Sequence, residues 1–268
     1  MLFKFLSKLR LRLYIMYASL FNKTIIGQVK DAFSVPIIIV NYNQLESIRN
    51  LINTLIKRGF HQIVILDNRS TYPPLLEYYE ELKSNPKITM HLLDENLGHM
   101  ALWLRKDILQ KYGDGYFVLT DPDILIEDSV PNDFMHIFIK LLNKHITVRK
   151  VGFSLKIDDI PDYYPNKEKV KSWEEQFWKE KEQNGHFIAR IDTTFALYRP
   201  TFIYDANGFE SAIRTNTPYN VKHLGWYIDY SNLSEEQKFY FQTANNSSSW
   251  LSDENGNLVS KKATQHYD

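Results

Sequence analysis

Gly115-Tyr-Phe-Val-Leu-Thr-Asp-Pro-Asp123 is the stretch that decides the fold, because an apolar run leads directly into two aspartates one residue apart. Tyr, Phe, Val and Thr favour the extended conformation, and a short run of this kind is typical of a buried strand. In open α/β sheets, ligands bind beyond the carboxyl ends of the strands. The stretch therefore predicts a strand over 115–120 that presents Asp121 and Asp123 at a ligand-binding edge.

Strand and helix patterns alternate on both sides of this stretch. We expect strands over 35–40, 62–66, 88–92, 151–157 and 189–198. Apolar residues at helical spacing predict helices over 44–58, 73–83, 100–111, 131–145 and 167–181. This order predicts an α/β sheet with helices on both faces. Three polar clusters, 41–43, 67–70 and 121–123, should then reach one edge.

The composition restricts the function. The chain has 268 residues, 44% of them hydrophobic, so it can bury a large core. Its 32 basic and 32 acidic side chains cancel, so no broad positive field attracts nucleic acid, which we do not expect as a partner. The chain has no cysteine, so any metal ligand must be Asp, Glu or His.

The N-terminal segment is basic and amphipathic. One helical face carries apolar side chains, and Lys4, Lys8 and Arg12 lie on another face. No apolar run reaches the roughly 18 to 20 residues that span a bilayer. Residues 1–30 therefore predict a helix on an anionic membrane surface, with packing on the protein itself or on a partner as the alternative. A cleaved signal peptide fits less well, because charges interrupt the apolar run.

Asp121 and Asp123 suit a hard divalent cation. Mg²⁺ and Mn²⁺ prefer oxygen ligands and accept a few carboxylates together with phosphate oxygens, so we expect one of these ions between the aspartates and a diphosphate. An Asp-x-Asp tripeptide also occurs by chance, with Asp123 as a helix cap in a turn. The buried lead-in favours the metal site, because a solvated turn does not need one.

The other strand ends carry side chains suited to a nucleotide. Asp67 can accept a hydrogen bond from a base, and Tyr42 can stack on one. Gly98 permits close approach of the backbone to a ligand. Each of these residues alone is equally consistent with a turn or with packing. The predicted donor-binding set is Asn41, Tyr42, Asn43, Asp67, Asn68, Asn96, Gly98 and Asp121.

The chain resembles the nucleotide-binding half of the GT-A glycosyltransferases, especially glycosyltransferase family 2, over roughly residues 35–125. The resemblance rests on four ordered motifs, Ile38-Ile-Val-Asn-Tyr-Asn43, Val64-Ile-Leu-Asp-Asn-Arg-Ser-Thr71, Glu95-Asn-Leu-Gly-His99 and Phe117-Val-Leu-Thr-Asp-Pro-Asp123. It implies a GT-A-type, Rossmann-like sheet followed by a C-terminal acceptor-binding portion. It also implies that Asp67 contacts the base and that Asp121 and Asp123 bind ribose and metal, with Asp123 as the direct ligand.

The catalytic base is less defined. The family usually has a glycine-rich strand followed by an acidic pair that serves as base, but no clear Glu-Asp follows the strand at 191–200. Asp192 is the first candidate, because it opens that strand and could reach an acceptor hydroxyl. A structural turn is its alternative role. Asp158 and Asp159 are rivals in a loop expected to overhang the donor edge.

The C-terminal half offers a third metal ligand and an acceptor platform. His223 resembles a late histidine that completes the metal site of several GT-A enzymes, and its imidazole suits Mn²⁺. Packing beside Trp226 is the alternative. Trp226 and Tyr227 have flat faces on which a sugar acceptor can stack.

Together these features predict a metal-dependent glycosyltransferase that moves a sugar from a nucleotide diphosphate donor, with a UDP-sugar favoured, to a glycan or lipid-linked glycan. Inversion and retention both stay open. The basic helix suggests synthesis of surface polysaccharide or lipopolysaccharide at the cytoplasmic, inner face of a membrane. The expected divisions are 1–30 for the helix, 31–128 for the donor half, 129–235 for the acceptor half and 236–268 for a polar extension.

Three other functions share parts of this pattern. A sugar-1-phosphate nucleotidyltransferase needs a glycine-rich loop after its first strand, and residues 41–46 contain no glycine. A haloacid-dehalogenase-like phosphatase needs Thr or Val where the chain has Leu125. A non-catalytic carbohydrate- or membrane-binding protein on a degenerate transferase fold stays open.

Overall fold

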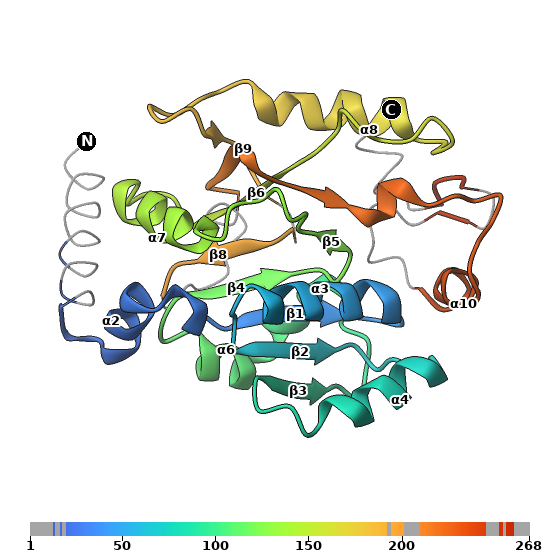
Figure 1. Cartoon of the computed structure of the whole chain (residues 1–268), viewed down its shortest axis with the longest axis horizontal. Helices are drawn as coiled ribbons and strands as arrows, with labels where there is room; N and C mark the ends of the chain where they lie inside the picture. Colours follow the sequence, from blue (N-terminus) through green and yellow to red (C-terminus); the bar gives the residue numbers. More distant parts are fainter. Residues whose placement is uncertain are drawn as a thin grey trace.

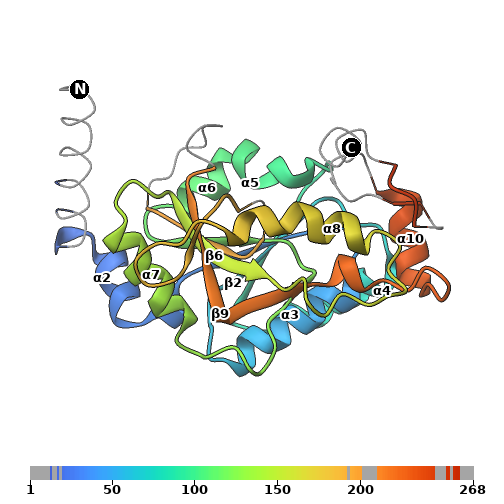
Figure 2. The same ribbon diagram turned by 90° about the horizontal axis from the view of Figure 1, so that it is seen from above.

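A computed structural model describes residues 20–191, 194–200, 210–244, 252–253 and 256–259, together with Leu13 and Tyr17. Across these residues one mixed sheet has the strand order β3-β2-β1-β4-β8-β6-β9-β5, and β7 pairs with β9 (Figure 1). Helices lie on both sides of it (Figure 2). The predicted α/β class, with a central sheet flanked by helices, is confirmed.

Parallel strands form the first part of the sheet. Their bounds are β1 Ile37–Asn41, β2 Ile63–Asp67, β3 Ile88–Leu92 and β4 Phe117–Thr120. The register places Asn41 beside Asp67, and Ile39 of β1 beside Thr120 of β4. Because the strands run in one direction, the polar clusters that follow β1, β2 and β4 reach the same edge of the sheet, as the sequence predicts.

Alternate side chains of β1 face opposite helix layers. Ile37 and Ile39 pack in the cluster that contains α3, α4 and α7, whereas Ile38 and Val40 pack in the cluster that contains α5 and α6. Cover on both faces explains why the strand is a continuous apolar run. The helix bounds are α3 Leu45–Lys57, α4 Pro73–Leu82, α5 Ala101–Leu104, α6 Lys106–Tyr112 and α7 Phe134–Lys144.

The second part of the sheet is mixed in direction. Its strands are β5 Ile124–Leu125, β6 Lys150–Leu155, β7 Phe187–Ile188, β8 Ala196–Tyr198 and β9 Ala212–His223. Strand β8 runs antiparallel to both β4 and β6. Strand β9 runs parallel to β6 and antiparallel to β5 and β7. The expected donor and acceptor halves therefore share one sheet.

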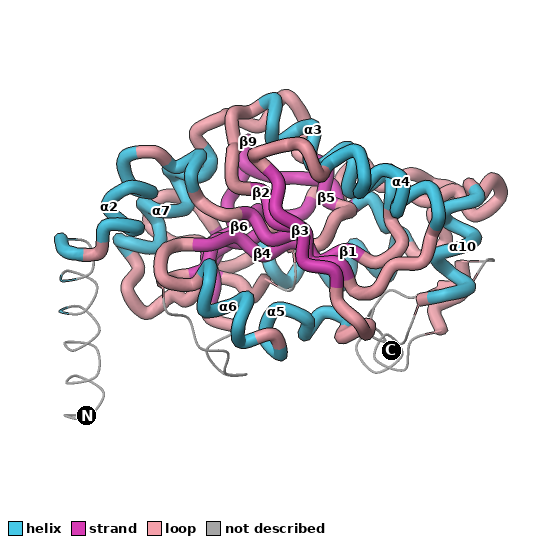
Figure 3. Tube along the Cα trace, turned by 90° about the horizontal axis from the view of Figure 1, so that it is seen from below, coloured by secondary structure: helices cyan, strands magenta, loops and turns pink. Residues whose placement is uncertain are grey.

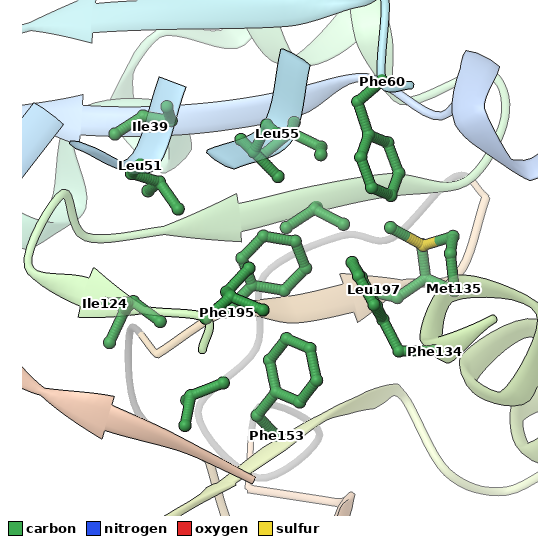
Figure 4. Packing of buried hydrophobic residues seen from close by; sticks show 14 of the residues in the cluster. Ile39, Leu51, Leu55, Phe60, Ile124, Phe134, Met135, Phe153, Phe195 and Leu197 are labelled. Atoms are coloured by element: carbon green, nitrogen blue, oxygen red, sulfur yellow. The ribbon is translucent and has the colours of Figure 1, made fainter. Parts of the chain in front are cut away.

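Aromatic side chains fill the core where the two parts of the sheet meet (Figure 4). The ring of Phe153 in β6 lies 5.0 Å from Phe134 of α7 and 5.3 Å from Phe195, which precedes β8. All three side chains are fully buried. Tilted and edge-to-face contacts at these distances are favourable beyond simple burial, so they help to fix β6 and β8 against α7.

Several predicted elements differ in the structure. The helix expected over 100–111 is broken at Arg105, whose ψ of 75° is not helical, and a 3-10 turn, η2 (Gly98–Met100), precedes it. The helix expected over 167–181 is α8 (Lys167–Glu174) followed by η3 (Glu175–Trp178). Of the strand expected over 189–198, only β8 forms among the described residues. The sequence did not predict β9 or the helix α10 (Glu235–Thr243).

The N-terminal helix predicted within 1–30 lies largely outside the described residues. The described part continues into α2 (Lys23–Lys30) and the short turn η1 (Ala32–Ser34). None of the described helices is long and apolar enough to cross a bilayer. At the other end of the molecule, α10 and α4 lie close to the carboxyl ends of β1 and β2 (Figures 1 and 3).

Candidate metal and donor site

Asp123 and His223 come together through a short strand pair. Strand β5 begins directly after Asp123 and runs antiparallel to the end of β9, so Ile124 lies opposite His223. The Leu224 backbone N–H donates to the Asp123 carbonyl at 2.7 Å. The His223 Nε2 atom lies 3.5 Å from the Asp123 Oδ2 atom. Two side chains far apart in the sequence therefore meet at the predicted edge.

Each side chain of this pair has a polar atom without a partner. The Asp123 and His223 side chains are 16% and 18% exposed. Buried Asp123 Oδ1 and His223 Nδ1 have no hydrogen-bond partner among the described residues. A buried polar group left unsatisfied costs about 1–3 kcal/mol, more for a charged one, so a bound cation would relieve this cost. A carboxylate beside an imidazole is a donor set that fits Mn²⁺.

The pair offers one carboxylate and one imidazole as potential ligands. The described part of the chain contains no group of three or more His, Asp or Glu side chains arranged to hold a metal ion. Mg²⁺ commonly keeps waters and is held by one or two carboxylates plus substrate phosphates. The site therefore fits an ion that arrives with, or is completed by, a phosphate ligand.

The turn after β9 is built closely around this pair. A Cβ atom on Gly225 would lie 2.8 Å from His223 Cε1 and 3.4 Å from Asp123 Oδ2. The Trp226 ring lies 5.0 Å from the His223 ring at an angle of 30°. Trp226 is only 2% exposed. Its ring lies against His223, which favours the packing role, and the acceptor role of Trp226 stays a prediction.

Asp121 follows the end of β4 and is partly buried. The Thr120 hydroxyl donates to the Asp121 carbonyl at 2.9 Å, which fixes the backbone there. Burial first, and then the charges of Asp123 and Asp121, raise the pKa of Tyr240 in α10. Both aspartates therefore disfavour the ionised form of this tyrosine.

Asp67 and Asn41 are buried in a hydrogen-bonded group. The Asp67 carboxylate accepts bonds from the Ser70 N–H at 2.7 Å and the Tyr79 hydroxyl at 2.8 Å. Asn41 Nδ2 also donates to the Tyr79 oxygen, at 2.8 Å. Asp67 is 2% exposed. These bonds and its burial give Asp67 a structural role at this edge.

The other predicted amides brace the loops of the edge. The positive φ of 51° at Asn43 turns the chain after β1, and Asn43 Oδ1 accepts from the backbone N–H groups of Thr71 and Tyr72. Asn68 donates to the Gly98 carbonyl at 3.0 Å. Asn96 Oδ1 accepts from the Gly98 N–H at 2.9 Å. These contacts give the three residues a clear structural role.

Helix α10 covers the same edge. The Tyr42 hydroxyl donates to the Thr243 carbonyl at 2.8 Å, and Asn43 Nδ2 donates to the Thr243 hydroxyl at 3.0 Å. The two Glu236 oxygens accept from the Glu46 N–H at 3.1 and 3.2 Å. This helix was not among the predicted elements, although Ser234 and Gln237 form a capping box, a pattern that marks a helix start.

The candidate bases are placed differently. Asp192 lies outside the described residues, and Asp158 is exposed. Asp159 accepts a hydrogen bond from Tyr227 and pairs with Lys222 at 2.7 Å. Burial acts to raise the pKa of Asp159, but Lys222 and Tyr227 together lower it. This arrangement favours an ion-paired support for Asp159 over a base.

Tyr227 belongs to the same charged group. Burial and the Asp159 carboxylate raise the pKa of Tyr227, so its hydroxyl stays protonated. The Lys222 ammonium lies 5.2 Å from the centre of the Tyr227 ring. One face of this predicted acceptor residue is therefore in contact with a cation.

Comparison with known proteins gives no family. No family model and no curated protein matches the chain. Among solved structures, the mannosyltransferase PcManGT from Pyrobaculum calidifontis, in complex with GDP-Man and Mn²⁺, is similar at 16% identity and a TM-score of 0.47, over 87% of this chain and 64% of that one. The bifunctional glycosyltransferase WbbM, in its apo structure, has 14% identity and a TM-score of 0.33, over 63% and 32%. This chain spans less than two thirds of either, and neither similarity assigns it an activity.

Proposed function

We propose that this chain is a metal-dependent glycosyltransferase that uses a nucleotide diphosphate sugar. The observation that carries the proposal is the meeting of Asp123 and His223 at the carboxyl edge of the sheet, each with a buried polar atom that lacks a partner among the described residues. In an open α/β sheet this edge is where a nucleotide binds. The four motifs that resemble the GT-A enzymes end at the same edge.

Asp123 and His223 would hold the divalent ion, with Asp121 beside them. When bound, the ion supplies positive charge that offsets the charge developing on the departing diphosphate. The hydrogen bonds of Asn43 and Asn68 to loop backbone groups keep the loops of the edge in one conformation. A preorganised edge of this kind orients the donor before the acceptor attacks.

An acceptor hydroxyl would approach from the second half of the chain. If the reaction inverts the sugar's configuration, Asp192 is the proposed base and Asp158 is its rival, because a general base must reach the proton that it removes. If the reaction retains configuration, this base is not needed. A UDP-sugar donor and a surface glycan acceptor are the favoured substrates.

A screen of nucleotide sugars with Mn²⁺ tests the function. A ligand that binds only the folded protein at about 100 times its Kd adds about 2.7 kcal/mol of stability, so one donor should raise the melting temperature by several degrees. The same donor should then be hydrolysed or transferred.

Asp123→Asn should remove both the melting shift and the turnover. Asp128→Asn is the control, because Asp128 is 82% exposed and pairs with Lys57 at the surface. A screen in which no nucleotide sugar stabilises the wild type would reject the proposal. Binding without any turnover would instead identify a non-catalytic binding protein.

We also propose that the N-terminal segment lies on an anionic membrane surface. Leu13, Tyr17, Leu20 and Phe21 are all more than half exposed in helical conformation. Deletion of residues 1–21 keeps Asn22, which caps α2 by accepting a bond from the Ile25 N–H. The deletion should abolish binding to anionic vesicles and leave donor hydrolysis intact. Unchanged vesicle binding would refute the idea, and Leu76→Glu, at another exposed leucine, is the matched surface control.

A further inference from the structure

Helix α10 turns one face toward the sheet edge. Residues 236, 239, 240 and 243 are three and four positions apart, so they share one side of the helix. Glu236 contacts the start of α3, and the Phe239 ring lies 5.1 Å from Tyr72. Thr243 accepts hydrogen bonds from the residues that follow β1. The face is therefore fixed at both of its ends.

Tyr240 lies between these contacts on the same face. Its spacing from Glu236 and Thr243 places its side chain on the face that contacts the start of α3 and the residues after β1. The effect of both carboxylates on Tyr240 agrees with this position. The Tyr240 side chain ends in a phenol, which is protonated at neutral pH and can donate a hydrogen bond.

The contacts make α10 a fixed wall of the edge. Gln44, the N-cap residue of α3, makes no side-chain capping bond. The Glu236 carboxylate takes over this role at the Glu46 N–H. A negative charge at a helix N-terminus is favourable, so α3 and α10 stabilise each other. The ring of Phe241 also stacks on Tyr230 at 5.7 Å, which fixes the far side of the helix.

We propose that α10 forms a wall of the donor pocket and that the Tyr240 hydroxyl donates a hydrogen bond to the nucleoside diphosphate held at Asp123. This inference rests on the proposed function. An anionic diphosphate would gain a neutral hydrogen-bond donor in addition to the cation held at Asp123 and His223. The Tyr42 hydroxyl donates to the Thr243 carbonyl, and this bond holds Tyr42 against the same helix.

Titration calorimetry of UDP binding in the presence of Mn²⁺ tests whether Tyr240 contacts the diphosphate. A hydrogen bond to a charged group contributes enough that Tyr240→Phe should weaken UDP binding by about tenfold. Mn²⁺ binding without nucleotide should be unchanged. Tyr116→Phe is the matched control, because Tyr116 precedes β4, at the opposite end of that strand from Asp121, and its hydroxyl bonds to Asn143.

A second measurement does not depend on a variant. In the wild type, UDP with Mn²⁺ should slow amide hydrogen exchange across residues 235–243. If Tyr240→Phe binds UDP as tightly as the wild type, or if exchange in α10 is unchanged, α10 does not line the donor pocket. Either result leaves the proposed function intact. Absence of any UDP, GDP, ADP or CDP binding to the wild type would overturn both.

Discussion

At the scale of single residues, the absence of a side chain at Gly225 lets His223 lie beside Asp123. His223 ends β9 and the chain turns at once, so the next residues pass close to its ring. Only a hydrogen atom fits between Gly225 and His223, because a Cβ atom there would lie 2.8 Å from Cε1 and 3.0 Å from Nδ1. The glycine therefore sets the position of the imidazole relative to Asp123.

Gly225→Ala should displace His223 and weaken Mn²⁺ binding in the presence of nucleotide by about tenfold, the effect of about 1.4 kcal/mol. Electron paramagnetic resonance of free Mn²⁺ measures this directly. Gly27→Ala is the control, because no atom lies within 4 Å of its Cβ position and it sits in α2. If Gly225→Ala binds Mn²⁺ as the wild type does, the close fit is not important for the site.

Only part of this site could be predicted from residues alone. Asp123 stands out because a buried strand leads into it. His223 was found only through a resemblance, since nothing local marks it. The internal bonds of Asp67 to Tyr79 and Ser70 depend on where α4 packs, and no spacing rule gives that. Asp67 therefore looked more open to a nucleotide than it is.

At the scale of elements, the parallel strands were predictable and β9 was not. Strands β1, β2 and β4 are apolar runs with turn residues at their ends, which is a strong pattern. Strand β9 contains Pro218 within a mostly polar stretch, and its pairing with β6 shifts register between Phe153 and Ser154. Proline inside a run argues against a strand unless a bulge accommodates it. Tertiary pairing decides this strand.

The C-terminal end of α7 is tied to the segment before β7 by Glu182. This carboxylate is 1% exposed and lies 3.1 Å from Lys144 and 3.2 Å from His145. Burial acts to raise the pKa of Glu182, but Lys144 and the backbone N–H groups of Asn184 and His186 bring it below the usual value. A lowered pKa in the folded state means that the stabilisation is present above the unfolded pKa and is lost as pH falls through the folded value.

Glu182→Gln should lower the free energy of unfolding at pH 7 by about 1–3 kcal/mol, because partly buried cations lose their partner. The difference from wild type should shrink as the pH falls below about 4.5, the ordinary glutamate range. Urea unfolding at pH 7 and pH 3.5 measures both values. Glu80→Gln, in an exposed pair with Lys83, should change little. An equal loss at both pH values would contradict the ionic role.

At the scale of the whole molecule, the Asp123–His223 pair joins the two parts of the sheet. Asp123 comes after β4, the last strand of the first part, and His223 comes from the end of β9, the long strand of the second part. The pairing of β5 with β9 brings Asp123 and His223 side by side. The pair therefore forms only when both parts of the chain are folded. This is why the sequence pattern of the first part could not show it.

Anomalous diffraction at the manganese edge, from crystals soaked with Mn²⁺ and UDP, tests directly whether Asp123 and His223 hold the metal ion. We expect one strong peak within about 2.5 Å of an Asp123 carboxylate oxygen and of a His223 ring nitrogen, with diphosphate oxygens as the other ligands of the ion. A manganese peak elsewhere, with Asp123 and His223 bound to no ion, would contradict it.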